Sequence, residues 1–259
     1  EIGDRRGEGN ALGNLGIAYA ELGDARKAIE YYEQQLAIAR EIGDRRGEGN
    51  ALGNLGLAYA DLGDSRQAIE YYEQALAIDR EIGDRRGEGA DLGNLGLAYA
   101  DLGDARQAIE YYEQALAIAR EIGDRRGEGN ALGNLGIAYK NLGDARQAIE
   151  YNEQALIIAR EIGDRRGEGA DLGNLGSAFY GLDEIDKSQD YYQQQLKIAQ
   201  EIGDRNGEAN ALWGQAICLK KKKDPVQAIA KAESALKIFE QIESPSASTM
   251  RELLAEWRK

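Results

Sequence analysis

Apolar residues recur along the chain at the three-to-four-residue spacing of an α-helix, in two sets for every 40 residues. The spacing places each set on one face of a helix, so the pattern predicts amphipathic helices over residues 5–22 and 25–42. No segment alternates with period two, so we expect an all-α chain. The first set comprises Leu12, Leu15, Tyr19 and Leu22, and the second comprises Ala28, Ile29, Tyr32, Leu36, Ala39 and Ile42.

A Gly-Asp pair stands at each boundary between predicted helices, at residues 23–24 and again at residues 43–44. Glycine just past a helix end adopts the left-handed conformation at little cost, and a following aspartate accepts hydrogen bonds from the free N–H groups of the next helix. Each Gly-Asp pair therefore predicts the end of one helix and the start of another, with almost no loop between them.

The segment Glu-Ile-Gly-Asp-Arg begins at residue 1 and returns at residues 41, 81, 121, 161 and 201, which gives a period of 40 residues. One helical hairpin is too thin to bury its apolar face alone, so neighbouring hairpins must stack and share a core. The sequence predicts an α-solenoid of six helix-turn-helix units over 1–243. Ser244 and Pro245 then open a capping helix within 244–259.

Glycines inside the first predicted helix of each unit need a reason, because each destabilises a helix by about 1 kcal/mol relative to alanine. Gly16 is explained if its missing side chain lets the paired helix approach opposite the small Ala28. The sequence offers no explanation for Gly7 and Gly9.

The spacing Leu12-x2-Leu15-Gly16-x2-Tyr19, followed by Ala28-x3-Tyr32, resembles the tetratricopeptide repeat signature. The first five units carry it and the sixth carries a degraded form. The unit is 40 residues rather than the usual 34, and it resembles the long repeats of spindle-orientation adaptors, kinesin light chains and sensor regions of bacterial signalling ATPases. The resemblance implies a right-handed superhelix whose concave groove binds a partner.

Polar residues on the first helix of each unit, opposite its apolar face, are the candidate binding residues. At 100° per residue, Arg6, Asn10 and Asn14 fall within about a quarter of the helical wheel. Asparagine suits an extended peptide backbone and arginine grips carboxylates. The resemblance to the adaptors implies that the asparagines hold peptide; the alternative is a copied neutral surface. The full set is Asn14, Asn54, Asn94, Asn134, Asn174, Arg6, Arg46, Arg86, Arg126, Arg166, Asn10, Asn50 and Asn130.

Composition narrows the range of functions. Lys and Arg number 32 against 46 Asp and Glu, and the net charge of −14 disfavours nucleic acid and anionic membrane as partners. Histidine is absent, which excludes imidazole catalysis and imidazole zinc sites. Cys218 is the single cysteine and no apolar run is long enough to cross a bilayer. We therefore expect a cytoplasmic protein that is no enzyme and has no cofactor or metal site.

Three functions fit these observations. The first is a protein-interaction scaffold that binds an extended, acidic peptide or a partner helix in the groove. The second is the ligand-sensing repeat region of a larger signalling ATPase or protease. The third is an engineered consensus array without a natural target, which the small differences between units favour and the irregular fifth and sixth units disfavour.

The first hairpin leads to one further expectation. The chain begins in mid-repeat, which suggests a fragment of a longer protein, with Glu1, Ile2 and Gly3 as the tail of an otherwise missing helix. Leu12 and Leu15 would then have no preceding unit to cover them, so we expect a weak homodimer through this uncapped repeat.

Overall fold

The computed structural model describes residues 4–258, and this part of the chain forms thirteen α-helices and no strand. The all-α prediction is therefore confirmed. The segment from Glu1 to Gly3, expected to be a helix tail, lies outside the described residues. The helices are α1 (Arg5–Glu21), α2 (Ala25–Ile42), α3 (Arg45–Asp61), α4 (Ser65–Ile82), α5 (Arg85–Asp101), α6 (Ala105–Ile122), α7 (Arg125–Asn141), α8 (Ala145–Ile162), α9 (Arg165–Gly181), α10 (Ile185–Ile202), α11 (Arg205–Lys221), α12 (Pro225–Gln241) and α13 (Ser246–Trp257).

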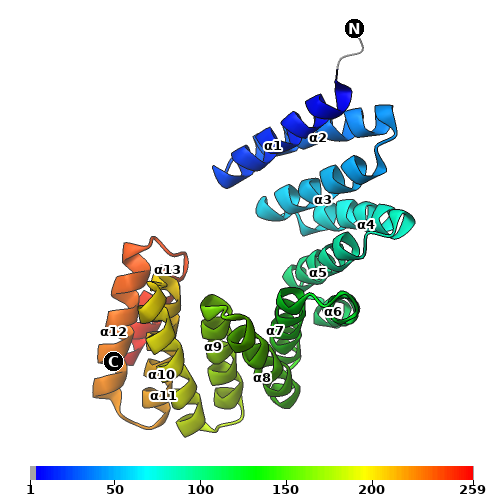
Figure 1. Ribbon diagram of the computed structural model, residues 1–259. Helices are drawn as coiled ribbons and strands as arrows, with labels where there is room; N and C mark the ends of the chain where they lie inside the picture. Colours follow the sequence, from blue (N-terminus) through cyan, green and yellow to red (C-terminus); the bar gives the residue numbers. More distant parts are fainter. Residues whose placement is uncertain (1–3, 259) are drawn as a thin grey trace. The chain divides into compact units, whose positions relative to one another are not determined.

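The chain divides into two compact units, Glu1–Gly127 and Glu128–Lys259. In the first unit each helix from α1 to α6 packs against the helices next to it in sequence, and the same holds from α8 to α13 in the second (Figure 1). The helices thus form repeating pairs, as the sequence predicts for a solenoid. The thirteenth helix buries Leu254 and stacks Trp257 on Trp213, with ring centroids 5.3 Å apart.

The Gly-Asp pairs end and start helices as expected. Gly43 closes α2 in the left-handed region at φ 68°, and the Asp44 carboxylate accepts a hydrogen bond from the backbone N–H of Gly47 at 3.1 Å. The turn imposes this conformation even where glycine is replaced, since Asp183 and Lys223 have φ values of 62° and 63°. The tight turns bring consecutive helices directly against one another.

The core is shared between neighbouring pairs. Leu52 and Leu55 of α3 pack against Tyr32 of α2 and against residues of α4, so one helix closes the cores of two repeats. Leu55 is fully buried, whereas the corresponding Leu15 of α1 is 45% exposed. Leu22 was expected on the buried face, but it lies beyond the last turn of α1 and is 79% exposed.

The helix-interior glycines make room for specific side chains of the paired helix. A Cβ on Gly56 would overlap the ring of Tyr72, which is 2% exposed and cannot move aside. Gly16 of the first repeat was expected to face the small Ala28. This expectation is wrong, because the side chain that faces Gly16 is Tyr32.

The structure also explains the two glycines near the start of α1, Gly7 and Gly9. A Cβ on Gly7 would collide with the carboxylate of Asp4, which must stay close to cap the helix. A Cβ on Gly9 would lie 3.3 Å from Ile38, tighter than ordinary van der Waals contact. Both glycines thus keep the start of the helix close to its cap and to the second helix of the pair.

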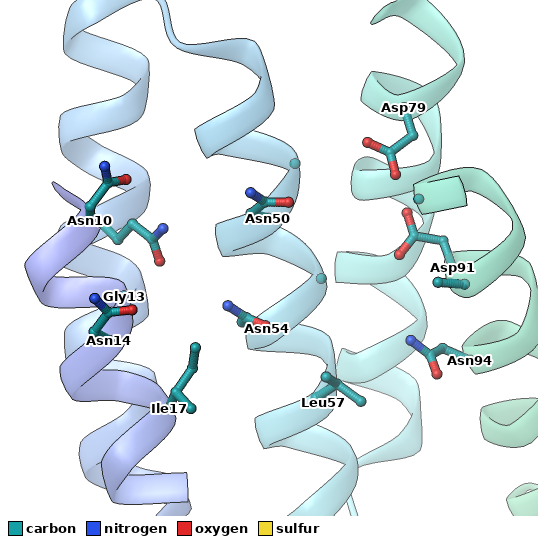
Figure 2. A pocket seen from close by; sticks show the side chains of 15 residues that line it. Asn10, Gly13, Asn14, Ile17, Asn50, Asn54, Leu57, Asp79, Asp91 and Asn94 are labelled. Atoms are coloured by element: carbon teal, nitrogen blue, oxygen red, sulfur yellow. The ribbon is translucent and has the colours of Figure 1, made fainter. Parts of the chain in front are cut away.

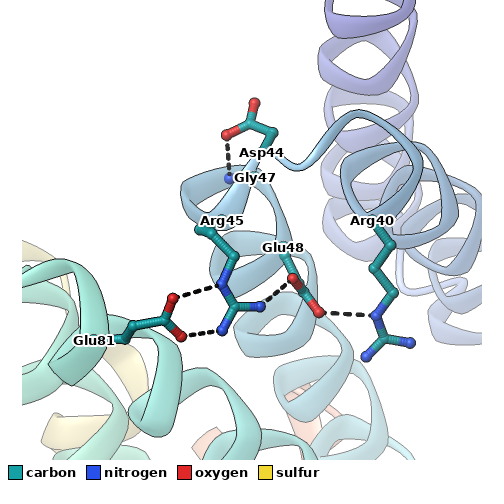
Figure 3. A network of polar contacts seen from close by, with 6 residues as sticks. All are labelled: Arg40, Asp44, Arg45, Gly47, Glu48 and Glu81. Carbon is teal, nitrogen blue, oxygen red and sulfur yellow. Dashed lines mark hydrogen bonds and ion pairs between the residues drawn. The ribbon is translucent and has the colours of Figure 1, made fainter.

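A network of charges ties consecutive repeats together (Figure 3). The buried carboxylate of Glu48 accepts a hydrogen bond from Arg40 of the preceding repeat at 2.8 Å and another from Arg45, which in turn pairs with Glu81 of α4. Burial alone would raise the pKa of Glu48, but the two arginines outweigh burial and hold that pKa below its usual range. The same arrangement recurs around Glu88 and Glu168.

Two glycines of α5 give a matched test of close packing. Gly96→Ala should lower the free energy of unfolding by about 1 to 3 kcal/mol, because its Cβ would overlap the buried ring of Tyr112. Gly93→Ala has no atom within 4 Å of its Cβ, so it should raise stability by up to about 1 kcal/mol through helix propensity. Urea denaturation measures both, and equal effects would contradict the proposed role of Tyr112.

The charge network can be tested at Glu88. Glu88→Gln should lower the free energy of unfolding by about 1 to 3 kcal/mol, because Arg80 and Arg85 lose their shared carboxylate. The pKa of Glu88 is lowered from 4.5, so this contribution is present above pH 4.5 and is lost as the pH falls through the folded-state pKa.

The control for Glu88 is Glu113→Gln, an exposed residue of α6. Thermal denaturation between pH 3 and pH 7 should show a difference between wild type and Glu88→Gln that shrinks toward pH 3. A difference that does not depend on pH would rule out the ion pairs as its source.

Candidate functional site

A groove of about 630 Å³ runs along the first unit, and side chains of α1, α3 and α5 form most of its lining. The lining also contains glycines, among them Gly13, Gly49 and Gly53. Ile17 and Leu57 line it as well and are about half exposed, so they offer apolar contact to a ligand. Successive repeats thus build one continuous surface from equivalent positions.

Asparagines recur along this groove, as the sequence analysis expects (Figure 2). Asn14, Asn54 and Asn94 come from the same position of α1, α3 and α5, and Asn10 and Asn50 lie one helical turn earlier. The third repeat has Ala90 in place of the earlier asparagine. Each amide offers a donor and an acceptor to whatever occupies the groove.

The arginine column lies beside the groove. Arg6 forms an ion pair with Asp44 at 3.2 Å, and Arg46 forms one with Asp84 at 3.4 Å. Both aspartates cap the first helix of the next repeat. The lining of the groove does not include Arg6 or Arg46, whose side chains are 69% and 70% exposed.

The remaining candidate residues occupy equivalent positions farther along the chain. Arg86 and Arg126 are exposed residues of the first unit. In the second unit, Asn130 is exposed and Asn134 and Asn174 are half-buried. Arg166 lines a smaller cavity of about 220 Å³ with Asn206 and Asn210.

Sequence reasoning missed three polar residues that line the groove: Gln35, Asp79 and Asp91. The sequence could have revealed these three residues because they depart from the repeat: most other repeats have alanine at each of the three positions. Gln35 corresponds to Ala75, Ala115 and Ala155 of other repeats. Asp79 corresponds to Ala39, Ala119 and Ala159, and Asp91 corresponds to Ala51 and Ala131.

Asp79 and Asp91 face each other across the contact between α4 and α5 (Figure 2). Asp91 is only 6% exposed, and burial together with the charge of Asp79 raises its pKa to about 8. Burial and the charge of Asp84 raise the pKa of Asp79 to about 6, with Arg46 acting in the opposite direction. The pair therefore holds a proton near neutral pH.

Two buried acceptor atoms in the groove have no hydrogen-bond partner in the structure. They are Oε1 of Gln35 and Oδ2 of Asp91, on side chains that are 8% and 6% exposed. Buried polar groups are normally satisfied, because leaving one unpaired costs about 1 to 3 kcal/mol. The groove thus carries unsatisfied capacity to accept hydrogen bonds.

In the second unit, Oε1 of Gln195 also lacks a hydrogen-bond partner, and burial together with the charge of Asp164 raises the pKa of Asp171 to about 7. The described residues contain no group of three or more acidic, cysteine or histidine side chains that could hold a metal ion. None of the helices described is long and apolar enough to cross a bilayer. Cys218 is fully buried, its Sγ lies 3.2 Å from Oγ of Ser188, and burial raises the pKa of its thiol.

Stacked helix pairs with a groove lined by recurring side chains define a helical-repeat solenoid, a class of protein that binds others through extended surfaces. The chain belongs to the tetratricopeptide repeat family, whose model matches residues 7–81, 90–161 and 170–241. A search of curated protein sequences finds no significant match to the chain.

Solved structures show the same fold at low sequence identity. A signal transduction ATPase with a tetratricopeptide repeat sensor from Pyrococcus horikoshii is 22% identical with a TM-score of 0.81, and the match covers 98% of this chain but 40% of that one. Nearly identical repeats of a putative kinesin light chain from Podospora anserina are 23% identical with a TM-score of 0.63, covering 74% of this chain and 95% of that one. A Rap protein complexed with Competence and Sporulation Factor is 18% identical with a TM-score of 0.69, covering 95% and 74%.

The acid pair makes stability depend on pH. The folded-state pKa of Asp91 is raised from 3.8 to about 8, so stability falls as the pH rises between those values. Asp91→Ala should therefore raise the free energy of unfolding on the order of 1 to 3 kcal/mol at pH 9, and by less at pH 5. Alanine occupies the equivalent buried positions 51 and 131, so the variant should pack normally.

The control for Asp91 is Asp101→Ala, an exposed aspartate at the end of the same helix. Thermal denaturation at both pH values should show a smaller change for this variant. A destabilised Asp91→Ala protein at pH 9 would show that the carboxyl has a stabilising partner.

Proposed function

We propose that the chain is a protein-interaction module whose first unit binds an extended peptide segment of a partner along the groove. The observation that carries this proposal is the recurrence of Asn14, Asn54 and Asn94 in one continuous groove. Each successive repeat places one asparagine at the same position in the groove, and this regular spacing suits a ligand whose backbone also repeats. No reaction is part of this proposal.

Extended peptides are the ligands that this lining fits best. Every residue of an extended chain presents an N–H group and a carbonyl, and each groove asparagine can pair with both. Ile17 and Leu57 add apolar contact beside the amides. A peptide side chain can therefore be buried while its backbone keeps its hydrogen bonds.

The acidic character of the peptide, expected from the arginine column, stays a prediction. Arg6 and Arg46 stand beside the groove and are more than two-thirds exposed, so they can reach a carboxylate at its edge. Such a carboxylate would have to compete with Asp44 and Asp84, at 3.2 and 3.4 Å. Acidic side chains would thus sit at the rim of the groove, where a salt-sensitive contribution is expected.

A second candidate is the sensor region of a larger signalling ATPase. The likeness to the Pyrococcus horikoshii structure supports it, because almost the whole of this chain matches part of that protein. In both proposals the groove binds a ligand, and they differ in whether an enzyme elsewhere responds. Near-identity of repeats does not favour an engineered array, since the Podospora anserina structure also has nearly identical repeats.

Further features of the partner remain proposals of the same kind. The net charge of −14 favours a protein or peptide partner over nucleic acid. A cytoplasmic location of the chain stays a prediction. Self-association through α1 is supported by the exposure of Leu15, whose counterpart Leu55 is fully buried.

The asparagines can be tested with a displayed library of random peptides selected on the immobilised protein. Replacing Asn54 and Asn94 together by alanine should weaken binding of the enriched peptides by about 1 to 3 kcal/mol, because peptide amides lose their partners. Circular dichroism should show an unchanged fold, since both side chains lie at the groove surface.

The matched control is Asn141→Ala, an exposed asparagine at the end of α7. It should leave peptide affinity unchanged. Failure to enrich any peptide, or equal affinity of wild type and the double variant, would overturn the proposed function.

A further inference from the structure

The acid pair of the groove is built by two departures from the repeat that meet at one place. Asp79 ends the second repeat and Asp91 lies in the third, and their carboxylates face each other at the groove (Figure 2). Most other repeats have alanine at these two positions, as the buried Ala39 and Ala51 show, and the exceptions are Asp171 and Phe239. Packing therefore does not require either carboxylate.

The charged groups around the pair leave it without a dedicated cation. Arg46 acts on Asp79 but pairs with Asp84, and Glu88 adds a like charge whose own partners are Arg80 and Arg85. Asp91 is influenced by burial and by Asp79, and neither favours a charged carboxylate.

Glycines of neighbouring helices make room for the two carboxylates. A Cβ on Gly87 would overlap the carboxylate of Asp79, and a Cβ on Gly49 would lie 3.1 Å from its Oδ1. A Cβ on Gly53 would lie 3.6 Å from Oδ1 of Asp91. Both carboxylates thus pack against backbone within the lining of the groove.

A separate observation points to the kind of ligand. Gln35 of the first repeat lines the same groove and is only 8% exposed. Its Oε1 has no hydrogen-bond partner. Oδ2 of Asp91 is a second unpartnered acceptor. Gln35 Oε1 and the ionised Asp91 carboxylate both accept hydrogen bonds, so this lining suits a ligand that donates them.

We propose that Asp79 and Asp91 form a subsite for a lysine or arginine side chain of the peptide bound in the groove. This inference rests on the function proposed above. A cationic side chain would donate hydrogen bonds to both carboxylates and allow both to ionise, with release to solvent of the proton that the pair holds. Charge-assisted hydrogen bonds of this kind are stronger than those between neutral groups.

A basic side chain at the acid pair is compatible with the net charge of the chain and with acidic residues elsewhere in the same peptide. The net charge of −14 attracts a basic segment over long range. Arg6 and Arg46 lie beside the groove, whereas Asp79 and Asp91 line it. A basic side chain entering the groove and acidic side chains at its edge would occupy different positions of one peptide.

The test is the same random-peptide selection, carried out on wild type and on the double variant Asp79→Ala, Asp91→Ala. Both substitutions introduce the residue found in most other repeats, so the variant is expected to fold. Wild type should enrich peptides with lysine or arginine at one position, and the double variant should lose that preference. Replacing the enriched basic residue by norleucine should weaken binding to wild type about tenfold or more and leave binding to the variant unchanged.

Binding should also depend on pH in a way that a packing role would not produce. Affinity of wild type for the basic peptide should rise between pH 6 and pH 9, with proton release detected by calorimetry in buffers of different ionisation enthalpy. Peptides that need Asn54 and Asn94 but show no basic preference would overturn this subsite and leave the proposed function intact. Absence of any enriched peptide would overturn both.

Discussion

The close approach of the two helices in each pair is the contact on which the rest of the structure depends. In most pairs a glycine of the first helix faces a buried tyrosine ring of the second, as Gly56 and Tyr72 do, and any side chain at the glycine would occupy the space of the ring. In the fourth pair Asn152 takes the place of the tyrosine opposite Gly136. Glycine weakens the isolated helix, so these pairs depend on the side chain that fills that space. The spacing within a pair then sets where the next pair can stack, and one core continues through neighbouring repeats of a unit.

Charges fix the stacking of pairs in addition to apolar burial. Glu48 is buried between arginines of two successive repeats, and removing either arginine would leave its charge only partly compensated. Arg6 and Arg46 also connect successive repeats, since each forms an ion pair with the aspartate that caps the first helix of the following repeat. Residues that looked like ligand contacts thus also connect one repeat to the next.

Departures from the repeat carry the specific chemistry of the groove. The recurring asparagines supply the same amide in each repeat, which suits a peptide backbone but does not fix which residue of the peptide lies at which repeat. Gln35, Asp79 and Asp91 each occur where most other units have alanine, and they place acceptors and charge at single points along the groove. A buried acid pair destabilises the free protein, which is typical of a site that is completed by a ligand.

The sequence by itself determined the helices, the period and the asparagine column, because Gly-Asp punctuation and 3.6-residue spacing act locally. Predicted helices 5–22 and 25–42 agree with Arg5–Glu21 and Ala25–Ile42 to within one residue. Only the tertiary structure decided what faces what. It put Tyr32 rather than Ala28 opposite Gly16 and brought Asp79 against Asp91. These contacts join different helices, and their geometry depends on how closely the backbones approach, which no spacing along one helix specifies.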